Sequence, residues 1–254
     1  MMAKIDAGRA TVLGLVLCPT RELAQQVHGV IATLGLPRGV RVAMTVGGDP
    51  IHPQIAQLQA GASPLEFQAP NLQYLMDSPA EFGPIVMREF RVGDRTFRFA
   101  LHHGGADADV DAFVADVEKI VREEGAIFGV YPGYGPGSYT FLADYLPFAS
   151  GDGMEHRNST VITSAGSIRG TRMGLLDTVA HEFFHNWNVE RIRPRSLEPF
   201  DFERANISGE LWLAEGFTQY YGPLSLSRAG LADLNETLDT MVGFVKAVAL
   251  NPAH

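Results

Sequence analysis

Residues 178–191 read TVAHEFFHNWNVER. His181 and His185 stand four positions apart, so on an α-helix they project from the same face, one turn apart. Both imidazoles can then reach one metal ion, and Glu182 on the rim of that face could take a proton from a water held there. The alternative is a helix that merely happens to carry two histidines. Apolar residues at helical spacing favour an amphipathic helix and hence the metal site: Leu175, Leu176, Val179, Phe183 and Trp187.

A catalytic zinc ion takes three protein ligands and keeps an open position for water, so the two histidines need a third partner. Glu215 lies in an apolar helical stretch between Trp212 and Phe217. Burying an unpaired carboxylate there would be costly, and coordination to a metal removes that cost. An exposed helix carboxylate is the alternative. The sequence therefore predicts one Zn²⁺ ion held by His181, His185 and Glu215.

Composition and charge narrow the class of protein. The chain has 254 residues and 46% hydrophobic residues, which is ordinary for a soluble globular protein. Its formal charge of −9 argues against nucleic-acid and membrane partners, both of which need clustered lysine and arginine. A single cysteine, Cys18, excludes an internal disulfide. Neither a signal peptide nor a transmembrane segment is evident, so we expect a soluble cytoplasmic protein.

Two parts of the chain differ in their residue patterns and composition. Residues 10–62 predict a β-α-β-α arrangement, because the apolar runs 12–17 and 40–46 are typical of buried parallel strands and a helical pattern follows each. From the Gly and Pro residues that follow this part, the composition becomes richer in aromatic and acidic residues. We therefore expect a small domain at 1–62 and a second at 63–254.

The second part alternates between strand and helix patterns. A helix is predicted over Val110–Val121, with Gly125 as its stop. Strands followed by helices favour an α+β fold over a doubly wound sheet. The strands are predicted at 86–92, 96–101, 139–146 and 159–163.

Three motifs in this part resemble a known family. The stretches HEFFHNWNVERIRP at 181–194 and WLAEGFT at 212–218 look like the glycyl aminopeptidase family of gluzincin zinc metallopeptidases. The separation of the third ligand from the second histidine, 215 − 185 = 30 positions, is typical of that family. The stretch GDGMEHRNS at 151–159 resembles the family's counterpart of the GxMEN motif. The resemblance covers roughly residues 66–250 and implies a thermolysin-like catalytic domain that is incomplete, truncated at its C-terminus.

The resemblance also implies an activity. It is that of a zinc-dependent aminopeptidase, which hydrolyses the N-terminal bond of a peptide and prefers Gly or Ala there. Glu182 would be the general base, and Glu155 would bind the free α-amine of the substrate, with Gly153 and Met154 beside it in the substrate-binding segment. Candidate outer-shell partners are Asn186 and Gln219.

The first part resembles a different family. LCPTRELAQ at 17–25 looks like the PTRELA segment of DEAD-box RNA helicases, and Val46-Gly47-Gly48 looks like the glycine pair downstream of it. This implies a small RecA-like, helicase-derived fragment. An ATP-driven helicase needs a GxxxxGK[ST] loop and an acidic metal-binding motif, and the sequence contains neither. Two alternatives to the aminopeptidase remain open: an inactive zinc-binding fusion of two fragments, and an RNA-helicase-related module.

Overall fold

A computed structural model describes residues 71–81, 84–135, 137–201 and 203–251, together with residues 25, 28–30 and 32–33. The chain divides into two compact units, residues 1–70 with 201–205 and residues 71–200 with 206–254. In the first unit, residues 25, 28–30 and 32–33 are helical. The strands predicted at 12–17 and 40–46 lie outside the described residues, and the domain boundary at residue 62 stays a prediction.

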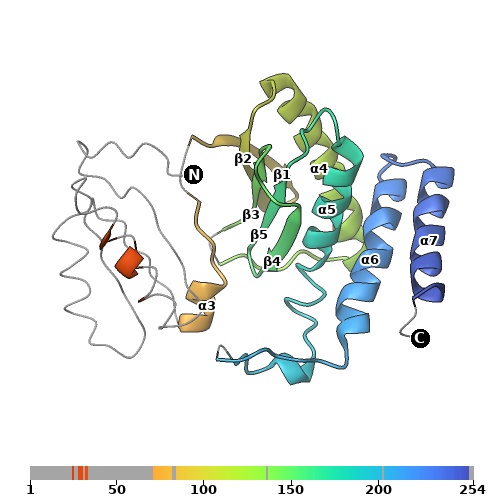
Figure 1. The fold of residues 1–254 in the computed structure, drawn as a ribbon. Coiled ribbons are helices and arrows are strands. Elements are labelled where there is room, and N and C mark those ends of the chain that lie inside the picture. The colour runs from red at the N-terminus through yellow and green to blue at the C-terminus, as the bar shows by residue number, and fades with distance from the viewer. Residues whose placement is uncertain are drawn as a thin grey trace. The chain divides into compact units, whose positions relative to one another are not determined.

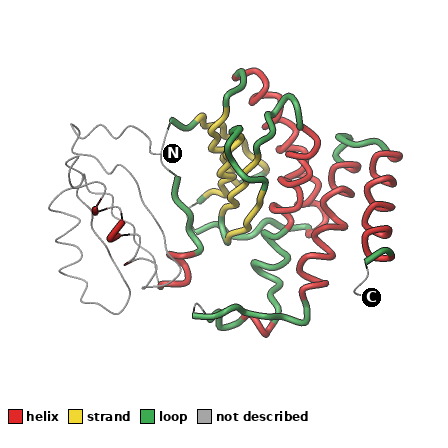
Figure 2. The backbone as a smooth tube through the Cα atoms, viewed as in Figure 1, coloured by secondary structure: helices red, strands yellow, loops and turns green. Residues whose placement is uncertain are grey.

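The second unit is built on a mixed five-stranded sheet in the order β1-β2-β3-β5-β4 (Figures 1 and 2). The central pairs β2–β3 and β3–β5 are parallel, whereas β1–β2 and β4–β5 are antiparallel. This agrees with the predicted combination of helices with a sheet that is not doubly wound. The strands are β1 Val86–Val92, β2 Arg95–His103, β3 Ser138–Tyr145, β4 Asp152–His156 and β5 Ser159–Ser164.

One predicted helix end was wrong. The helix predicted to stop at Gly125 continues to Phe128, and Gly129 ends it in the left-handed conformation with φ 72°. Gly125 is small for another reason, because a Cβ atom there would lie 2.1 Å from the hydroxyl of Tyr131. The described helices are α3 Leu72–Met76, α4 Asp107–Phe128, α5 Arg172–Phe184, α6 Leu211–Arg228 and α7 Leu234–Ala249, with a short 3₁₀ turn, η2, at Arg195–Leu197.

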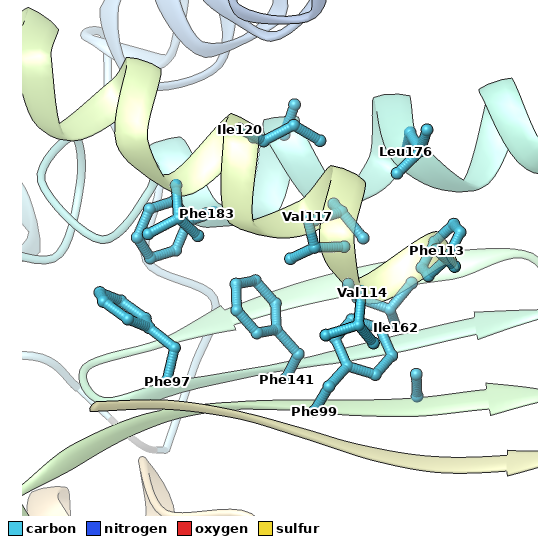
Figure 3. Close-up of a cluster of buried hydrophobic side chains, with 14 of the residues drawn as sticks. Phe97, Phe99, Phe113, Val114, Val117, Ile120, Phe141, Ile162, Leu176 and Phe183 are labelled. Atoms are coloured by element: carbon cyan, nitrogen blue, oxygen red, sulfur yellow. The ribbon is translucent and has the colours of Figure 1, made fainter. Parts of the chain in front are cut away.

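The hydrophobic core lies between one face of the sheet and the helices α4 and α5 (Figure 3). Successive side chains of a strand alternate between its two faces, so Phe97, Phe99 and Leu101 of β2 all point into this layer and are 0% exposed. Phe183 of α5 packs edge-on against Phe97, with ring centroids 5.8 Å apart. Each such buried side chain contributes roughly 1.5–3 kcal/mol to folding, so α5 is held firmly by its apolar face.

The far end of α5 is fixed by an aromatic contact. Trp187 stacks on Phe128 at the end of α4, with ring centroids 4.5 Å apart and an interplanar angle of 8°. Its indole Nε1 also donates a hydrogen bond of 2.8 Å to the carbonyl of Val130. The stacking and the hydrogen bond of Trp187 therefore hold the segment that follows α5 against the end of α4.

Helix α4 carries a buried acid that faces α6. Glu124 is 0% exposed, and neither of its carboxylate oxygens has a hydrogen-bond partner within the described residues. Burial raises the pKa of Glu124 well above its usual range, and the nearby Ser225 of α6 only partly opposes this effect. The folded protein therefore keeps Glu124 neutral at pH values where the unfolded chain ionises it.

Replacing Glu124 by Gln should stabilise the protein more at pH 8 than at pH 5. The folded-state pKa lies above the unfolded value, so the parent loses stability as the pH rises through and above the ordinary glutamate range, and Gln removes that loss. We expect the gain in unfolding free energy to be larger at pH 8 by about 1 kcal/mol or more, measured by urea denaturation at both pH values. Asp239→Asn, at an exposed position of α7, should show no such difference. An equal effect of Glu124→Gln at both pH values would contradict a neutral buried acid.

Candidate active site

Three candidate ligand atoms converge where α5 meets α6. The Nε2 atoms of His181 and His185 lie 3.1 Å apart. Oε2 of Glu215 lies 3.3 Å from the first and 3.5 Å from the second. The structure thus brings together the three residues that the sequence proposed as metal ligands.

These separations fit a tetrahedral metal ion. Four ligands at 2.0–2.1 Å from a zinc ion place any two ligand atoms about 3.3 Å apart, which is the spacing found here. The His185 side chain is 2% exposed, that of His181 is 21% exposed and that of Glu215 is 46% exposed. The group is closed on the core side and open on the other, as a site that admits a water molecule and a substrate requires.

The spacing of residues along α6 explains how Glu215 reaches the histidines. Gly222 lies seven residues, or about two turns, after Glu215 and therefore on the same face. A Cβ atom at Gly222 would lie 3.5 Å from the backbone nitrogen of His181, so the two helices approach closely there. The carboxylate of Glu215 consequently points at α5.

The side chain of Glu215 is 46% exposed, so it is not fully in solvent, but its apolar neighbours do little to cover it. Trp212 is 67% exposed and Phe217 is 44% exposed, because both lie away from the face that meets α5. The carboxylate is instead stabilised by the two imidazoles. Their contacts hold the pKa of Glu215 well below its usual range. Burial works to lower the pKa of His185, yet its contact with Glu215 and the charge of Glu155 raise it to about 9.

Asn188 orients two of the ligands at once, and the sequence analysis missed it. Its backbone carbonyl lies 2.7 Å from Nδ1 of His185, which assigns a proton to Nδ1 and makes Nε2 the nitrogen that would bind a metal once its own proton has left. Its side-chain amide donates to the carbonyls of Leu213 and Ala214 and to the hydroxyl of Thr218, at 2.9–3.1 Å. Asn188 thereby joins a histidine ligand to the first turns of the helix that carries Glu215.

The two outer-shell candidates from the sequence have different surroundings. Asn186 donates to the hydroxyl of Tyr134 at 2.8 Å and accepts from Arg191, so it supports the loop after α5 rather than a ligand. Arg191 also donates to the Asn186 carbonyl at 2.9 Å. Gln219 is half-buried on α6, one turn beyond Glu215. The sequence signal that could have pointed to Asn188 is a polar amide placed between Trp187 and Val189.

Glu182 lies beside the candidate ligands and is almost fully buried. Its residue is 6% exposed, and Oε2 has no hydrogen-bond partner within the described residues. Burial raises the pKa of Glu182 to about 7, and the two histidines only partly offset this. A carboxylate with such a pKa can both accept and release a proton near neutral pH.

Strand β4 runs past Glu182 and presents alternate residues to it. A Cβ atom at Gly153 would lie 2.2 Å from Oε1 of Glu182, so only glycine fits against this carboxylate. Glu155, two residues on, faces the same way, and its carboxylate lies within 4.8 Å of ligand atoms of Glu182 and His185. Met154 alternates to the other face of β4, where it is 56% exposed. The structure therefore groups Gly153 and Glu155, but not the Met154 side chain, with the histidines.

A second cluster could hold a metal by its residue types. Nδ1 of His102, at the end of β2, lies 2.5 Å from Glu81 and 2.8 Å from Asp144, its register partner on β3. These are hydrogen-bond distances and fall short of the roughly 3.3 Å that tetrahedral zinc imposes. Burial raises the pKa of Glu81 to about 7. The cluster therefore fits a shared proton better than a zinc ion.

The residues around the candidate site match a known family. Residues 174–254 match the family model of the M61 glycyl aminopeptidases. The predicted resemblance is thereby confirmed over the segment that carries both histidines and Glu215. Peptidase chemistry is accordingly the class of activity that this family match supports.

A solved structure gives independent support. An aminopeptidase N family protein from Idiomarina loihiensis superposes with a TM-score of 0.55 and 27% sequence identity, covering 61% of this chain. The matched part is 27% of that protein, so this chain spans about a quarter of its solved relative. Both comparisons therefore show a likeness to aminopeptidases.

Curated sequences confirm the second resemblance. The chain is 42% identical over 59 residues to the ATP-dependent RNA helicase DBP8 of Eremothecium gossypii, which is 23% of this chain and 14% of the helicase. It is 41% identical over 61 residues to the DEAD-box ATP-dependent RNA helicase CshA of Streptococcus pneumoniae, which is 24% of this chain and 12% of the helicase. The chain therefore spans only about an eighth of the length of these two helicases. Along the described residues, no helix combines the length and apolar character needed to cross a bilayer.

Replacing Asn188 by Ala should weaken zinc binding about 10- to 100-fold, because the side chain that joins α6 to the histidine loop is lost. Competition with a fluorescent chelator measures this affinity directly and does not depend on catalysis. Asn235→Ala, at an exposed position of α7, serves as the matched control and should bind zinc as the parent does. Unchanged affinity in Asn188→Ala would show that Glu215 reaches the histidines without this joint.

Proposed function

We propose that this chain carries the catalytic site of a zinc-dependent aminopeptidase that removes small N-terminal residues, Gly or Ala, from peptides. The observation that supports it best is the triangle formed by His181, His185 and Glu215, whose donor atoms lie 3.1–3.5 Å apart. A single Zn²⁺ ion fits this triangle. The proposed preference for small residues is supported by the match to the family of glycyl aminopeptidases.

Glu182 is the proposed general base. When bound, zinc would polarise the scissile carbonyl and acidify a water molecule. The Glu182 carboxylate takes the proton of the attacking water and later passes it to the leaving amine. Its pKa of about 7 suits both transfers near neutral pH, and its burial keeps competing water away from the carboxylate.

Glu155 is the proposed anchor for the substrate's free α-ammonium group. Its carboxylate lies on the same face of β4 as Gly153 and close to Glu182. An ammonium group held there fixes the first peptide bond of the substrate near Glu182, which makes the reaction an aminopeptidase reaction. β4 is also an edge strand of the sheet, so an extended peptide could pair with it along Gly153 and Met154.

The finer features of the fold are part of the same proposal. We infer a thermolysin-like catalytic domain over residues 63–254 and a RecA-like, helicase-derived fragment over residues 1–62. The first is supported by the HExxH helix α5 against a mixed sheet and by the solved relative, and the second by the short helicase matches. An inactive zinc-binding fusion of these two parts is the competing proposal.

The replacement Glu182→Gln tests the enzyme directly. It keeps the shape of the side chain but removes the base, so turnover of Gly- and Ala-anilides should fall by about 10²–10⁴-fold, with one zinc ion per chain retained. Initial rates and metal stoichiometry are measured on the same preparations, and Glu118→Gln on the surface of α4 is the control. Zinc bound to a parent chain that shows no Glu182-dependent hydrolysis would leave the inactive fusion as the better proposal.

The replacement Gly153→Ala tests the position of the base. The new methyl group would lie 2.2 Å from Oε1 and 2.5 Å from Cδ of Glu182, so the carboxylate has to move. A displacement of about 1 Å costs on the order of 10²-fold in rate, while zinc affinity should be kept because no ligand is touched. Gly104→Ala is the control, since a Cβ atom there would meet no atom within 4 Å. Full activity of Gly153→Ala would mean that Glu182 does not act from the position described.

A further inference from the structure

A pocket of about 380 Å³ opens beside the site, between the start of β4 and the N-terminal half of α5. Gly153 lines the pocket and also packs against Glu182, so the pocket lies directly beside the proposed base. Thr178 lines it from α5, one turn before Glu182 and on the same side of the helix. The size is within the range of small-molecule and side-chain binding pockets.

The direction of β4 assigns this pocket to one side of the scissile bond. Glu155, the proposed ammonium anchor, lies two residues beyond Gly153, and Asp152 lies on the opposite side of Gly153. A path from Glu155 past Glu182 to Asp152 therefore follows a substrate from its N-terminus towards its C-terminus. The pocket is reached only after the bond that is cut, so it faces the residue that follows that bond.

The chemistry of the lining selects for hydrogen-bond donors. Three threonine hydroxyls donate hydrogen bonds to backbone carbonyls: Thr163 to that of Ser150, Thr171 to that of Ser167 and Thr178 to that of Gly174. Their oxygen lone pairs remain as acceptors. Asp152 adds a carboxylate, which itself accepts from the Gly153 amide at 3.0 Å. None of the lining residues carries a positive charge, and Leu175 is the single aliphatic side chain beyond glycine among them.

We propose that this pocket binds the second residue of the substrate and prefers a basic side chain there, Lys or Arg, whose cationic group reaches Asp152. The inference rests on the proposed aminopeptidase function and names a specificity of the same site. A cationic donor satisfies the acceptors, a leucine side chain leaves them desolvated and unpaired, and a glutamate side chain meets a like charge. Thr178 and Asp152 are then specificity-determining residues.

Peptides of the form Ala-X-Ala-Ala, with X as Lys, Leu or Glu, test the preference in the zinc-loaded chain. Release of free alanine gives kcat/KM for each peptide. We expect Lys to exceed Leu by about five- to tenfold and to exceed Glu by more. In Asp152→Asn the ratio of Lys to Leu should fall towards one, whereas Asp94→Asn, the same change in the exposed β1–β2 turn, should keep the parent ratio. Binding of the same peptides to the zinc-loaded Glu182→Gln chain, measured by calorimetry, provides a second readout that needs no turnover.

The outcomes separate the two proposals. Hydrolysis at equal rates for all three peptides, or a Lys preference that survives in Asp152→Asn, overturns the pocket assignment and leaves the aminopeptidase standing. Lys-selective binding that needs Asp152, without hydrolysis by the parent chain, overturns the enzyme and supports the preference of the pocket. If the parent chain shows neither hydrolysis nor selective binding, both proposals are overturned.

Discussion

The packing of α5 on two sides is the constraint on which the rest of the site depends. Its apolar face is buried against the sheet through Leu176 and Phe183, while its other face meets α6 through His181. Because both faces are occupied, the helix can neither rotate nor slide without opening the core. The histidines and the candidate base therefore inherit their positions from hydrophobic packing, and their own contacts have little to add to the orientation of the helix.

A polar joint completes what packing begins. α6 carries the third candidate ligand, and it meets α5 at Gly222, which lies beside His181, and through the stacked rings of Phe184 and Tyr221. Asn188 supplies the register, since its side-chain amide bonds carbonyls in the first turn of α6 while its backbone carbonyl holds His185. Asn188 thus sets the orientation of the His185 ring and the position of Glu215 along the axis of α6. Loss of such a group leaves buried backbone carbonyls short of a partner, and this explains why a neutral side chain can matter to a charged site.

Much of this arrangement could be predicted from the sequence, for physical reasons that differ from residue to residue. The strand at Val86–Val92 has the predicted bounds because alternation along a half-buried strand is a local signal. His181 and His185 could be grouped because helical spacing is a local signal, whereas Glu215, 30 positions further on, was added from ligand chemistry and from the family resemblance. β4 was not predicted as a strand, since Asp152 and Gly153 have low strand propensity and the strand exists through its pairing with β5. The role of Asn188 and the pressure of Gly153 on Glu182 depend on contacts between distant segments, which no local pattern encodes.

The hairpin that joins β4 to β5 has a further consequence. His156 pairs with Ser159, so two residues alone make the turn, and such a turn leaves the register of the two strands little freedom. The interval from Gly153 to Glu155 is then a fixed spacing of two residues, about 6.7 Å, alongside the peptide. On the proposed assignment, this spacing sets the length of the fragment released. A change of register by one residue would bring Met154 against the base, and a change by two would measure out a different product.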